Sequence, residues 1–193
     1  MLNSIQGISC FRHSPLHILS LSNNALETIP EEITTLSNLT HLYLDDNKLR
    51  EFPSVLLQLS QLQYLQLSGN RLCELPELTN CWEHLEELLL DKCQLTSVPA
   101  SLALLHNLRI LNLGNNLLEE LPASLCELQN LEKLILNSNR LTCIPQFVGQ
   151  LSNLTVLIAN SNQIETVPEE LADLKNLKTL WLANNKIKGL LLK

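Results

Sequence analysis

The sequence predicts an α/β solenoid, a right-handed curved superhelix with a parallel β-sheet on its concave side and short helical turns on its convex side. One 23-residue unit, LxxLxLxxNxLxxLPxxLxxLxN, recurs without a gap from Leu16, seven times over its full length and an eighth time in part. A fixed period of this length is typical of repeat arrays in which each unit packs only against its neighbours. Hydrophobic residues make up 45% of the chain but aromatic residues only 4%, which favours a core of stacked leucine layers. The first leucines of the units are Leu16, Leu39, Leu62, Leu85, Leu108, Leu131, Leu154 and Leu177.

Each unit is expected to begin with a short strand. In the segment LxxLxLxx, alternate leucines such as Leu19 and Leu21 follow the two-residue period of a strand and point to the same side. Eight such strands, repeated at one spacing, predict a parallel sheet. The residues between the leucines then point outward from the sheet in columns that run along the solenoid.

A row of asparagines follows the strands. The asparagine of each unit is expected to turn inward and to hydrogen-bond the backbone where the chain leaves the strand. Because buried amides are tolerated only when they are hydrogen-bonded, the repeat predicts a continuous ladder. Cys93 is a weaker hydrogen-bond donor than asparagine, so a small local loss of stability is expected there. The row consists of Asn24, Asn47, Asn70, Cys93, Asn116, Asn139, Asn162 and Asn185.

The helical half of each unit is marked by an apolar residue followed by proline, as in Leu121-Pro122. Proline suits the first turn of a helix, and the apolar positions three and six residues later are expected to face inward. The segment PELTNCWEHL, residues 76–85, departs from this pattern. Thr79 and Trp82 occupy its two inward positions and Leu78 is displaced by one residue. We expect Trp82 to pack in the space left by the small Thr79.

The two ends of the chain match the repeat poorly. Residues 1–15 are expected to form a short partial cap, in which Ile5, Ile8, Cys10 and Phe11 cover the first layer of the core. The repeat domain is expected to span residues 16–193, with the last repeat left uncapped. Two explanations stay open for that end: the chain is a fragment of a longer protein, or a partner or a second copy covers it by end-to-end association.

Composition excludes several classes of protein. The net charge of −7 and the pI near 5.2 argue against nucleic-acid binding and favour a partner with a basic surface. No apolar run approaches the roughly 18 residues that a membrane span needs. The six cysteines are scattered within the repeats, and the N-terminus lacks the features of a secretion signal. Reduced thiols and a cytoplasmic location are therefore expected.

No constellation of catalytic residues is predicted. Cys81 with His84, or Cys126 with His106, would be the candidate nucleophile pairs, but no orienting third residue follows from the spacing. The sequence contains no C-x-x-C pair and no HExxH motif, so no metal site is expected. We therefore expect neither an enzyme nor a cofactor.

Residues 16–187 resemble intracellular leucine-rich-repeat proteins. The resemblance lies in segments such as LTHLYLDDNKLREFPSVLLQLSQ and LTVLIANSNQIETVPEELADLKN. It is greatest to Ras-pathway scaffolds, Ras-suppressor-like proteins and polarity scaffolds of the Scribble and Erbin type. The resemblance implies a non-catalytic module that binds another protein, such as a small GTPase or a signalling enzyme. The alternative is the recognition segment of a larger receptor, ubiquitin ligase or phosphatase whose effector domain is absent.

Two groups of outward residues are the candidate partner-binding surfaces. Tyrosine beside acidic residues suits a basic peptide, although ordinary surface charge would look the same. An apolar group around a tryptophan suits a protein partner, although β-branched residues also simply favour strands. Leu89 lies between the two groups in the middle column. We name the first group the acidic tyrosine patch (Tyr43, Asp45, Tyr64, Glu87 and Asp91) and the second the apolar patch (Ile110, Ile135, Val156, Ile158 and Trp181).

Overall fold

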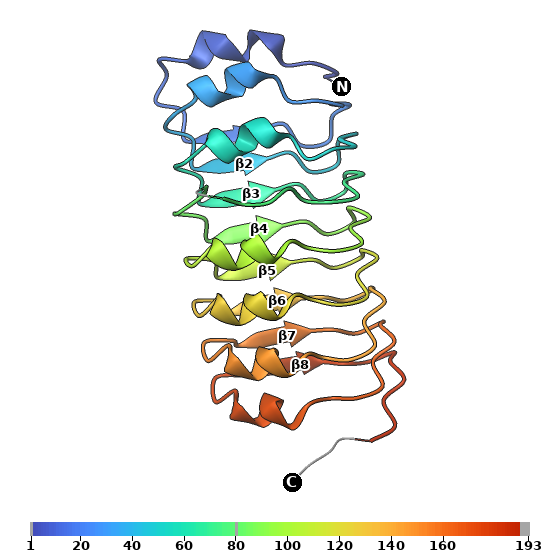
Figure 1. The fold of residues 1–193 in the computed structure, drawn as a ribbon. Helices are drawn as coiled ribbons and strands as arrows, with labels where there is room; N and C mark the ends of the chain where they lie inside the picture. The colour runs from blue at the N-terminus through green and yellow to red at the C-terminus, as the bar shows by residue number, and fades with distance from the viewer. Residues whose placement is uncertain (1, 80, 190–193) are drawn as a thin grey trace.

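The computed structural model describes residues 2–79 and 81–189, in which eight strands form one parallel sheet in chain order (Figure 1). Every strand has three residues with a leucine in the middle, and each residue pairs with the residue one repeat later, as Leu42 does with Leu65. The predicted fold class is confirmed. The strands are β1 (Ile18–Ser20), β2 (His41–Tyr43), β3 (Tyr64–Gln66), β4 (Glu87–Leu89), β5 (Ile110–Asn112), β6 (Lys133–Ile135), β7 (Val156–Ile158) and β8 (Thr179–Trp181).

On the opposite side, six of the repeats carry a short 3₁₀ turn, and a further turn lies in the N-terminal segment before the first repeat. The proline before each of the six turns within the repeats lies one residue ahead of the first helical residue, not inside the turn as predicted. Pro122, for example, has φ −66°, and its carbonyl accepts a hydrogen bond from Leu125 N at 3.1 Å. The turns are η1 (Gln6–Phe11), η2 (Glu31–Thr35), η3 (Ser54–Gln58), η4 (Ala100–Leu104), η5 (Ala123–Glu127), η6 (Gln146–Gln150) and η7 (Glu169–Asp173).

The third repeat differs from the others between its proline and β4. Its described residues, 76–79 and 81–84, form no helical turn. Trp82 is buried as predicted, and its Nε1 donates to Leu56 O at 2.9 Å. The prediction that Thr79 faces inward is wrong, because Leu78 is buried and Thr79 is exposed. Inward residues three apart suit the period of a 3₁₀ turn, whereas Leu78 and Trp82 are four apart and cannot both face inward from one.

The predicted asparagine ladder is confirmed. Asn47 Oδ1 accepts from Leu26 N at 3.0 Å, and its Nδ2 donates to Leu21 O at 2.9 Å and to Leu44 O at 3.0 Å. The same pattern recurs at Asn70, Asn116, Asn139, Asn162 and Asn185. Each of these amides therefore joins two consecutive repeats.

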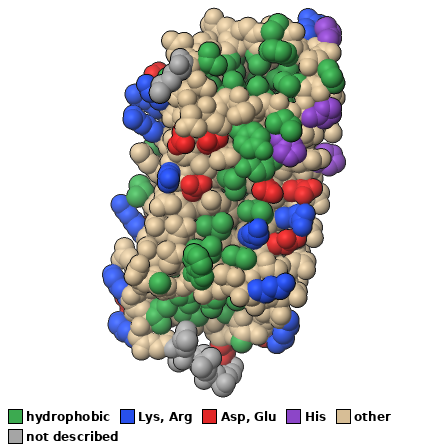
Figure 2. Space-filling view, turned by 180° about the vertical axis from the view of Figure 1, so that it is seen from behind, with side chains coloured by type: hydrophobic (Ala, Val, Ile, Leu, Met, Phe, Trp, Pro, Cys, Tyr) green, Lys and Arg blue, Asp and Glu red, His purple; other side chains and the backbone are tan. Residues whose placement is uncertain are grey.

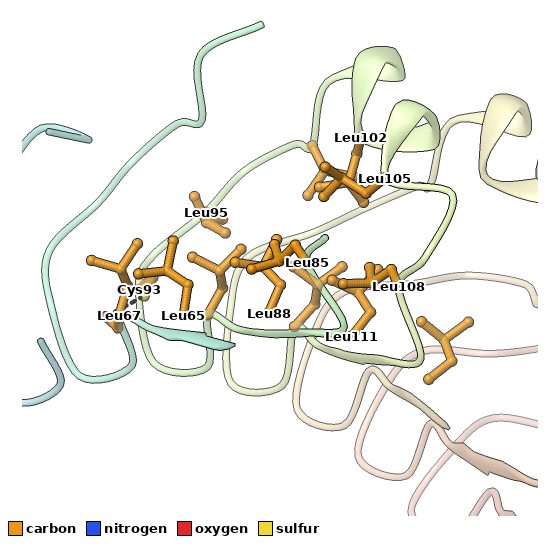
Figure 3. Close-up of a cluster of buried hydrophobic side chains, with 14 of the residues drawn as sticks. Leu65, Leu67, Leu85, Leu88, Cys93, Leu95, Leu102, Leu105, Leu108 and Leu111 are labelled. Atoms are coloured by element: carbon orange, nitrogen blue, oxygen red, sulfur yellow. Dashed lines mark hydrogen bonds between the residues drawn. The ribbon is translucent and has the colours of Figure 1, made fainter. Parts of the chain in front are cut away.

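The core lies between the sheet and the turns, where leucines from both sides meet in layers (Figure 3). At the N-terminal end, Ile5 and Ile8 are buried against this core. Cys10 and Phe11 are exposed, so the expectation that they also cover the first layer is wrong. The prediction that the last repeat is uncapped concerns mainly residues 190–193, which lie outside the described part of the chain.

All six cysteines are free thiols, and Cys93 is buried. Within residues 2–79 and 81–189, no helix has the length and apolar character that crossing a membrane requires.

Candidate partner-binding face

The candidate residues lie on the outer side of the sheet, which we name the sheet face. In β2 to β5 and in β7 the middle leucine is buried while the residues on either side of it are half-buried. Figure 2 shows this face, with hydrophobic and acidic side chains near its middle and histidine side chains toward one edge. Every residue predicted to bind a partner is therefore at least partly accessible.

Three aromatic rings form a stack within the acidic tyrosine patch. The His41 and Tyr64 rings lie 5.8 Å apart between centroids, with 12° between their planes. Tyr43 lies 4.8 Å from Tyr64, tilted by 35°. The Tyr64 hydroxyl donates to Gln66 Oε1 at 2.8 Å, which holds its ring over the sheet. His41 and Gln66 were not among the predicted residues, although both stand in the columns that contain the tyrosines.

Carboxylates surround this stack. Asp45 accepts a hydrogen bond from Ser22 Oγ, and Asp91 accepts one from Ser68 Oγ and one from Asn112 Nδ2 at 3.1 Å. Glu87 is the register partner of Tyr64. Burial, and then the charges of Tyr43, Glu87, Asp45 and Asp91, raise the pKa of Tyr64 to about 12. The structure thus brings all five predicted members of the acidic tyrosine patch into one electrostatic neighbourhood.

The apolar patch is continuous along one column only. Ile135, Ile158 and Trp181 are consecutive register partners on β6, β7 and β8, and Trp181 is 59% exposed. Ile110 and Val156 stand in the neighbouring column, where the exposed Lys133 separates them. The patch is therefore an apolar strip that ends at Trp181 and is flanked by two isolated apolar residues.

Leu89 lies apart from that strip. Its register partners are Gln66 on β3 and Asn112 on β5, so Asn112 separates it from Ile135. Leu89 therefore belongs beside Tyr64 and Glu87, at the margin of the acidic tyrosine patch.

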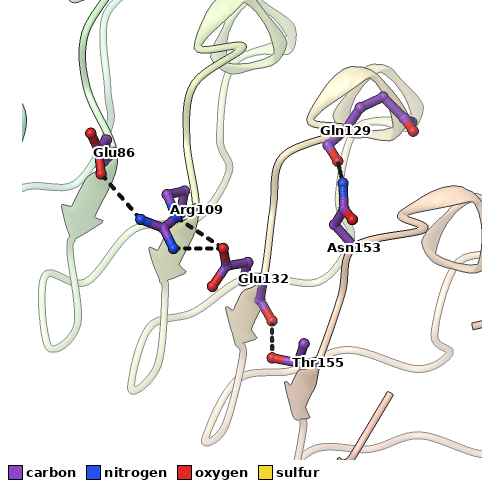
Figure 4. Close-up of polar contacts among 6 residues, drawn as sticks. All are labelled: Glu86, Arg109, Gln129, Glu132, Asn153 and Thr155. Atoms are coloured by element: carbon purple, nitrogen blue, oxygen red, sulfur yellow. Dashed lines mark hydrogen bonds and ion pairs between the residues drawn. The ribbon is translucent and has the colours of Figure 1, made fainter. Parts of the chain in front are cut away.

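A polar groove along the edge where the chain enters the strands was not predicted (Figure 4). Arg109 bridges two neighbouring repeats there, with Glu132 at 2.8 Å and Glu86 at 3.5 Å, and the hydrogen bond to Glu132 raises the pKa of Arg109. One wall carries a second row of asparagines that each donate to a carbonyl of the preceding repeat: Asn107, Asn130, Asn153 and Asn176. These residues recur at the repeat spacing, so the sequence contained the signal.

Cys81, one of the thiols considered as a nucleophile, has the wrong electrostatics for that role. Burial raises the pKa of the Cys81 thiol, whereas an activated cysteine has a lowered pKa. Burial also raises the pKa of Cys93 to about 12. Among the described residues, no group of three or more histidine, cysteine or acidic side chains is arranged to hold a metal ion.

Comparison with known proteins agrees with this geometry. A model described as "Leucine rich repeat" matches residues 14–72, and a model described as "Leucine-rich repeat region" matches residues 81–190, more than half of the chain. The chain belongs to the leucine-rich repeat family. Members of this family build the sheet face and its opposite helical face from the repeat found here, so the family explains the scaffold and leaves the outward residues to be interpreted.

Similar solved structures come from bacteria and plants. Internalin C2 of Listeria monocytogenes is 32% identical, with 90% of this leucine-rich repeat chain and 74% of the internalin covered at a TM-score of 0.78. The ectodomain of the Arabidopsis thaliana receptor kinase GASSHO1/SCHENGEN3, in complex with CASPARIAN STRIP INTEGRITY FACTOR 2, is 35% identical. That match covers 88% of this chain but only 21% of the ectodomain, also at a TM-score of 0.78.

A similar curated protein is the probable serine/threonine-protein kinase roco9 of Dictyostelium discoideum. It is 53% identical over 45 residues, which are 23% of this chain and 1% of the kinase. The chain therefore spans a very small part of that relative.

Proposed function

We propose that this leucine-rich repeat domain is a non-catalytic interaction module that binds a partner protein on its sheet face. The observation that carries the proposal is the stack of His41, Tyr43 and Tyr64 beside the carboxylates of Asp45 and Glu87. The stack lies on β2 and β3, so other repeats flank it on both sides. It is therefore part of the accessible sheet face and lies away from the two ends of the array.

The composition of this surface favours a protein partner. Tyrosine supplies a large contact area with few rotatable bonds, and it is enriched at interfaces together with tryptophan. The stacking and the bond from Tyr64 to Gln66 hold the rings in place before a partner arrives, which lowers the entropy lost on binding. Carboxylates beside the rings favour a partner with a basic contact surface.

The apolar strip of Ile135, Ile158 and Trp181 is proposed as a second contact on the same face. It lies two to three strands beyond the acidic tyrosine patch, so one extended partner surface would reach both. Adjacent strands are about 4.8 Å apart, and the span from β3 to β8 is on the order of 24 Å. A basic segment and an apolar segment at that separation would match the face.

The resemblance to Ras-pathway and polarity scaffolds supports a setting in cytoplasmic signalling complexes, with a small GTPase or signalling enzyme as partner. A second candidate is the recognition segment of a larger receptor or kinase. It is favoured by the similarity to a plant receptor ectodomain solved with its factor and to a short part of a kinase. Both candidates use the sheet face, and they differ in what else is joined to the domain.

Affinity capture from an extract of the source cells tests the proposal. We compare the wild-type chain with Tyr43→Ala/Tyr64→Ala and with Trp181→Ala, and identify the captured proteins by mass spectrometry. Leu104→Ala is the matched control, because Leu104 is 49% exposed on η4, on the helical side. The proposal expects a partner that wild type and Leu104→Ala retain and the sheet-face variants lose. Partners that persist with all variants would exclude the sheet face as the binding surface.

A further inference from the structure

We propose that the acidic tyrosine patch receives an arginine side chain of the partner, with the guanidinium held against the Tyr64 ring by the carboxylates of Glu87 and Asp91. This inference rests on the proposed function and adds the chemistry of the central contact. It follows from the residues that border the Tyr64 ring, from the charge around that ring, and from the flatness of the guanidinium group.

The Tyr64 ring is covered by other aromatic rings on the side that faces β2. His41 and Tyr43, which cover it, both belong to β2. On its other side the register places β4, with Glu87 opposite Tyr64 and Leu89 opposite Gln66. The aromatic ring, an acidic side chain and an apolar side chain thus border the same half-buried position on the sheet face.

The acidic side chains at this position take part in none of the ion pairs found among the described residues. The strands β1 to β5 carry no lysine or arginine. The ion pairs found among the described residues lie at Glu86–Arg109–Glu132 and at Glu165–Lys188, outside the patch. Burial first, and then the neighbouring charges, which include Glu87 and Asp91, raise the pKa of Tyr64.

Two of the carboxylates are already oriented by the protein. Ser22 donates to Asp45, while Ser68 and Asn112 donate to the same oxygen of Asp91. These bonds use Oδ1 of each aspartate, which leaves Oδ2 to accept from a ligand. Such fixed acceptors favour a donor with fixed geometry, because little rotational freedom is lost when the two meet.

Arginine fits these features better than lysine does. Its guanidinium is flat, stacks on aromatic rings, and can present several N–H groups to carboxylates at once. A lysine ammonium is a compact, strongly hydrated charge and gains less from a ring face. Leu89 would contact the methylene groups that carry the guanidinium.

Nuclear magnetic resonance of the whole chain tests this inference, because its only two tyrosines, Tyr43 and Tyr64, are both in the patch. The probes are capped tripeptides with arginine, lysine or the uncharged analogue citrulline between two glycines. We expect saturable shifts of the tyrosine ring signals and of the Leu89 methyl signals with the arginine probe. Its dissociation constant should be at least about threefold lower than that of the lysine probe, and citrulline should bind weakest.

Glu87→Gln keeps the size of the side chain and removes its charge, and should weaken binding of the arginine probe by about threefold or more. Glu31→Gln is the control, because it makes the same change on η2. Equal affinity for lysine and arginine, equal effects of the two variants, or no shift at the tyrosines would each overturn the inference. If those results came while Tyr43→Ala/Tyr64→Ala still lost the captured partner, the proposed function would stand and only the arginine contact would fall.

Discussion

At the scale of single residues, Cys93 is the one interruption of the buried asparagine ladder. Its Sγ donates to Leu67 O at 3.3 Å, which replaces one amide bond of the other repeats. One repeat later, Asn116 Oδ1 accepts a hydrogen bond from Leu95 N. The backbone donor at the equivalent place for residue 93 is Leu72 N. A thiol has no oxygen to accept that bond. The sequence predicted both the ladder and this weak point, because the residues that form it recur at one position of the repeat.

We expect Cys93→Asn to raise the free energy of unfolding by about 1 kcal/mol, since the amide restores the missing acceptor while keeping a donor. The reverse change in an intact repeat, Asn139→Cys, should lower it by a similar amount. Urea denaturation followed by circular dichroism measures both. A Cys93→Asn variant that is no more stable than wild type would show that the ladder is already complete without the amide.

The burial of Tyr64, together with the charge of the patch, makes this residue contribute to stability at high pH. Its pKa is raised to about 12 in the folded protein from an ordinary value near 10. The folded state therefore keeps the phenol proton where the unfolded state loses it. This contribution to stability is fully present below about pH 10 and is lost as the pH rises toward 12.

Tyr64→Phe should consequently lose less stability than wild type between about pH 9 and pH 11. Urea denaturation at several pH values in this range measures the difference, and the ultraviolet absorbance of the phenolate reports the titration directly. A difference between the two proteins that does not change with pH would contradict the assignment.

At the scale of elements, the helical side shows what the repeat pattern could and could not predict. The spacing of three between inward residues predicted the turns of the regular repeats. In the third repeat the displaced Leu78 changes this spacing, and the described residues form no helical turn but bury Leu78 and Trp82 instead. The pattern located the irregularity, but the new path depends on contacts with the neighbouring repeat, such as the bond from Trp82 to Leu56 O.

Close packing of η6 against η7 leads to a prediction for Gly149. A Cβ added there would lie 2.4 Å from the backbone oxygen of Glu170 and 2.8 Å from its carbonyl carbon. Because backbone cannot move aside as a flexible side chain can, Gly149→Ala should lower the free energy of unfolding by about 1–3 kcal/mol.

The control for this prediction is Gly7→Ala in η1, where an added Cβ meets no atom within 4 Å. Its effect should be small, or slightly stabilising because the unfolded chain loses freedom. Thermal unfolding of both variants beside wild type makes the comparison. Equal effects of the two substitutions would show that the contact between η6 and η7 is looser than the structure has it.

At the scale of the whole molecule, a constant repeat makes the sheet face readable from the sequence. Register partners are always 23 residues apart, so the columns and their neighbours follow directly from the printed sequence. What the sequence could not predict is side-chain placement within the columns, such as the stacking of His41 on Tyr64 and the bridge of Arg109 between two glutamates. Both depend on rotamers chosen by local contacts.

Site-specific photo-crosslinking to the captured partner would show directly whether the partner binds the sheet face. A photoreactive amino acid replaces Leu89 or Ile158 on the sheet face in turn, and Leu104 on η4 serves as the control. We expect the partner to be crosslinked from positions 89 and 158 and not from position 104. Crosslinking from position 104 alone would contradict this expectation and place the binding surface on the helical side.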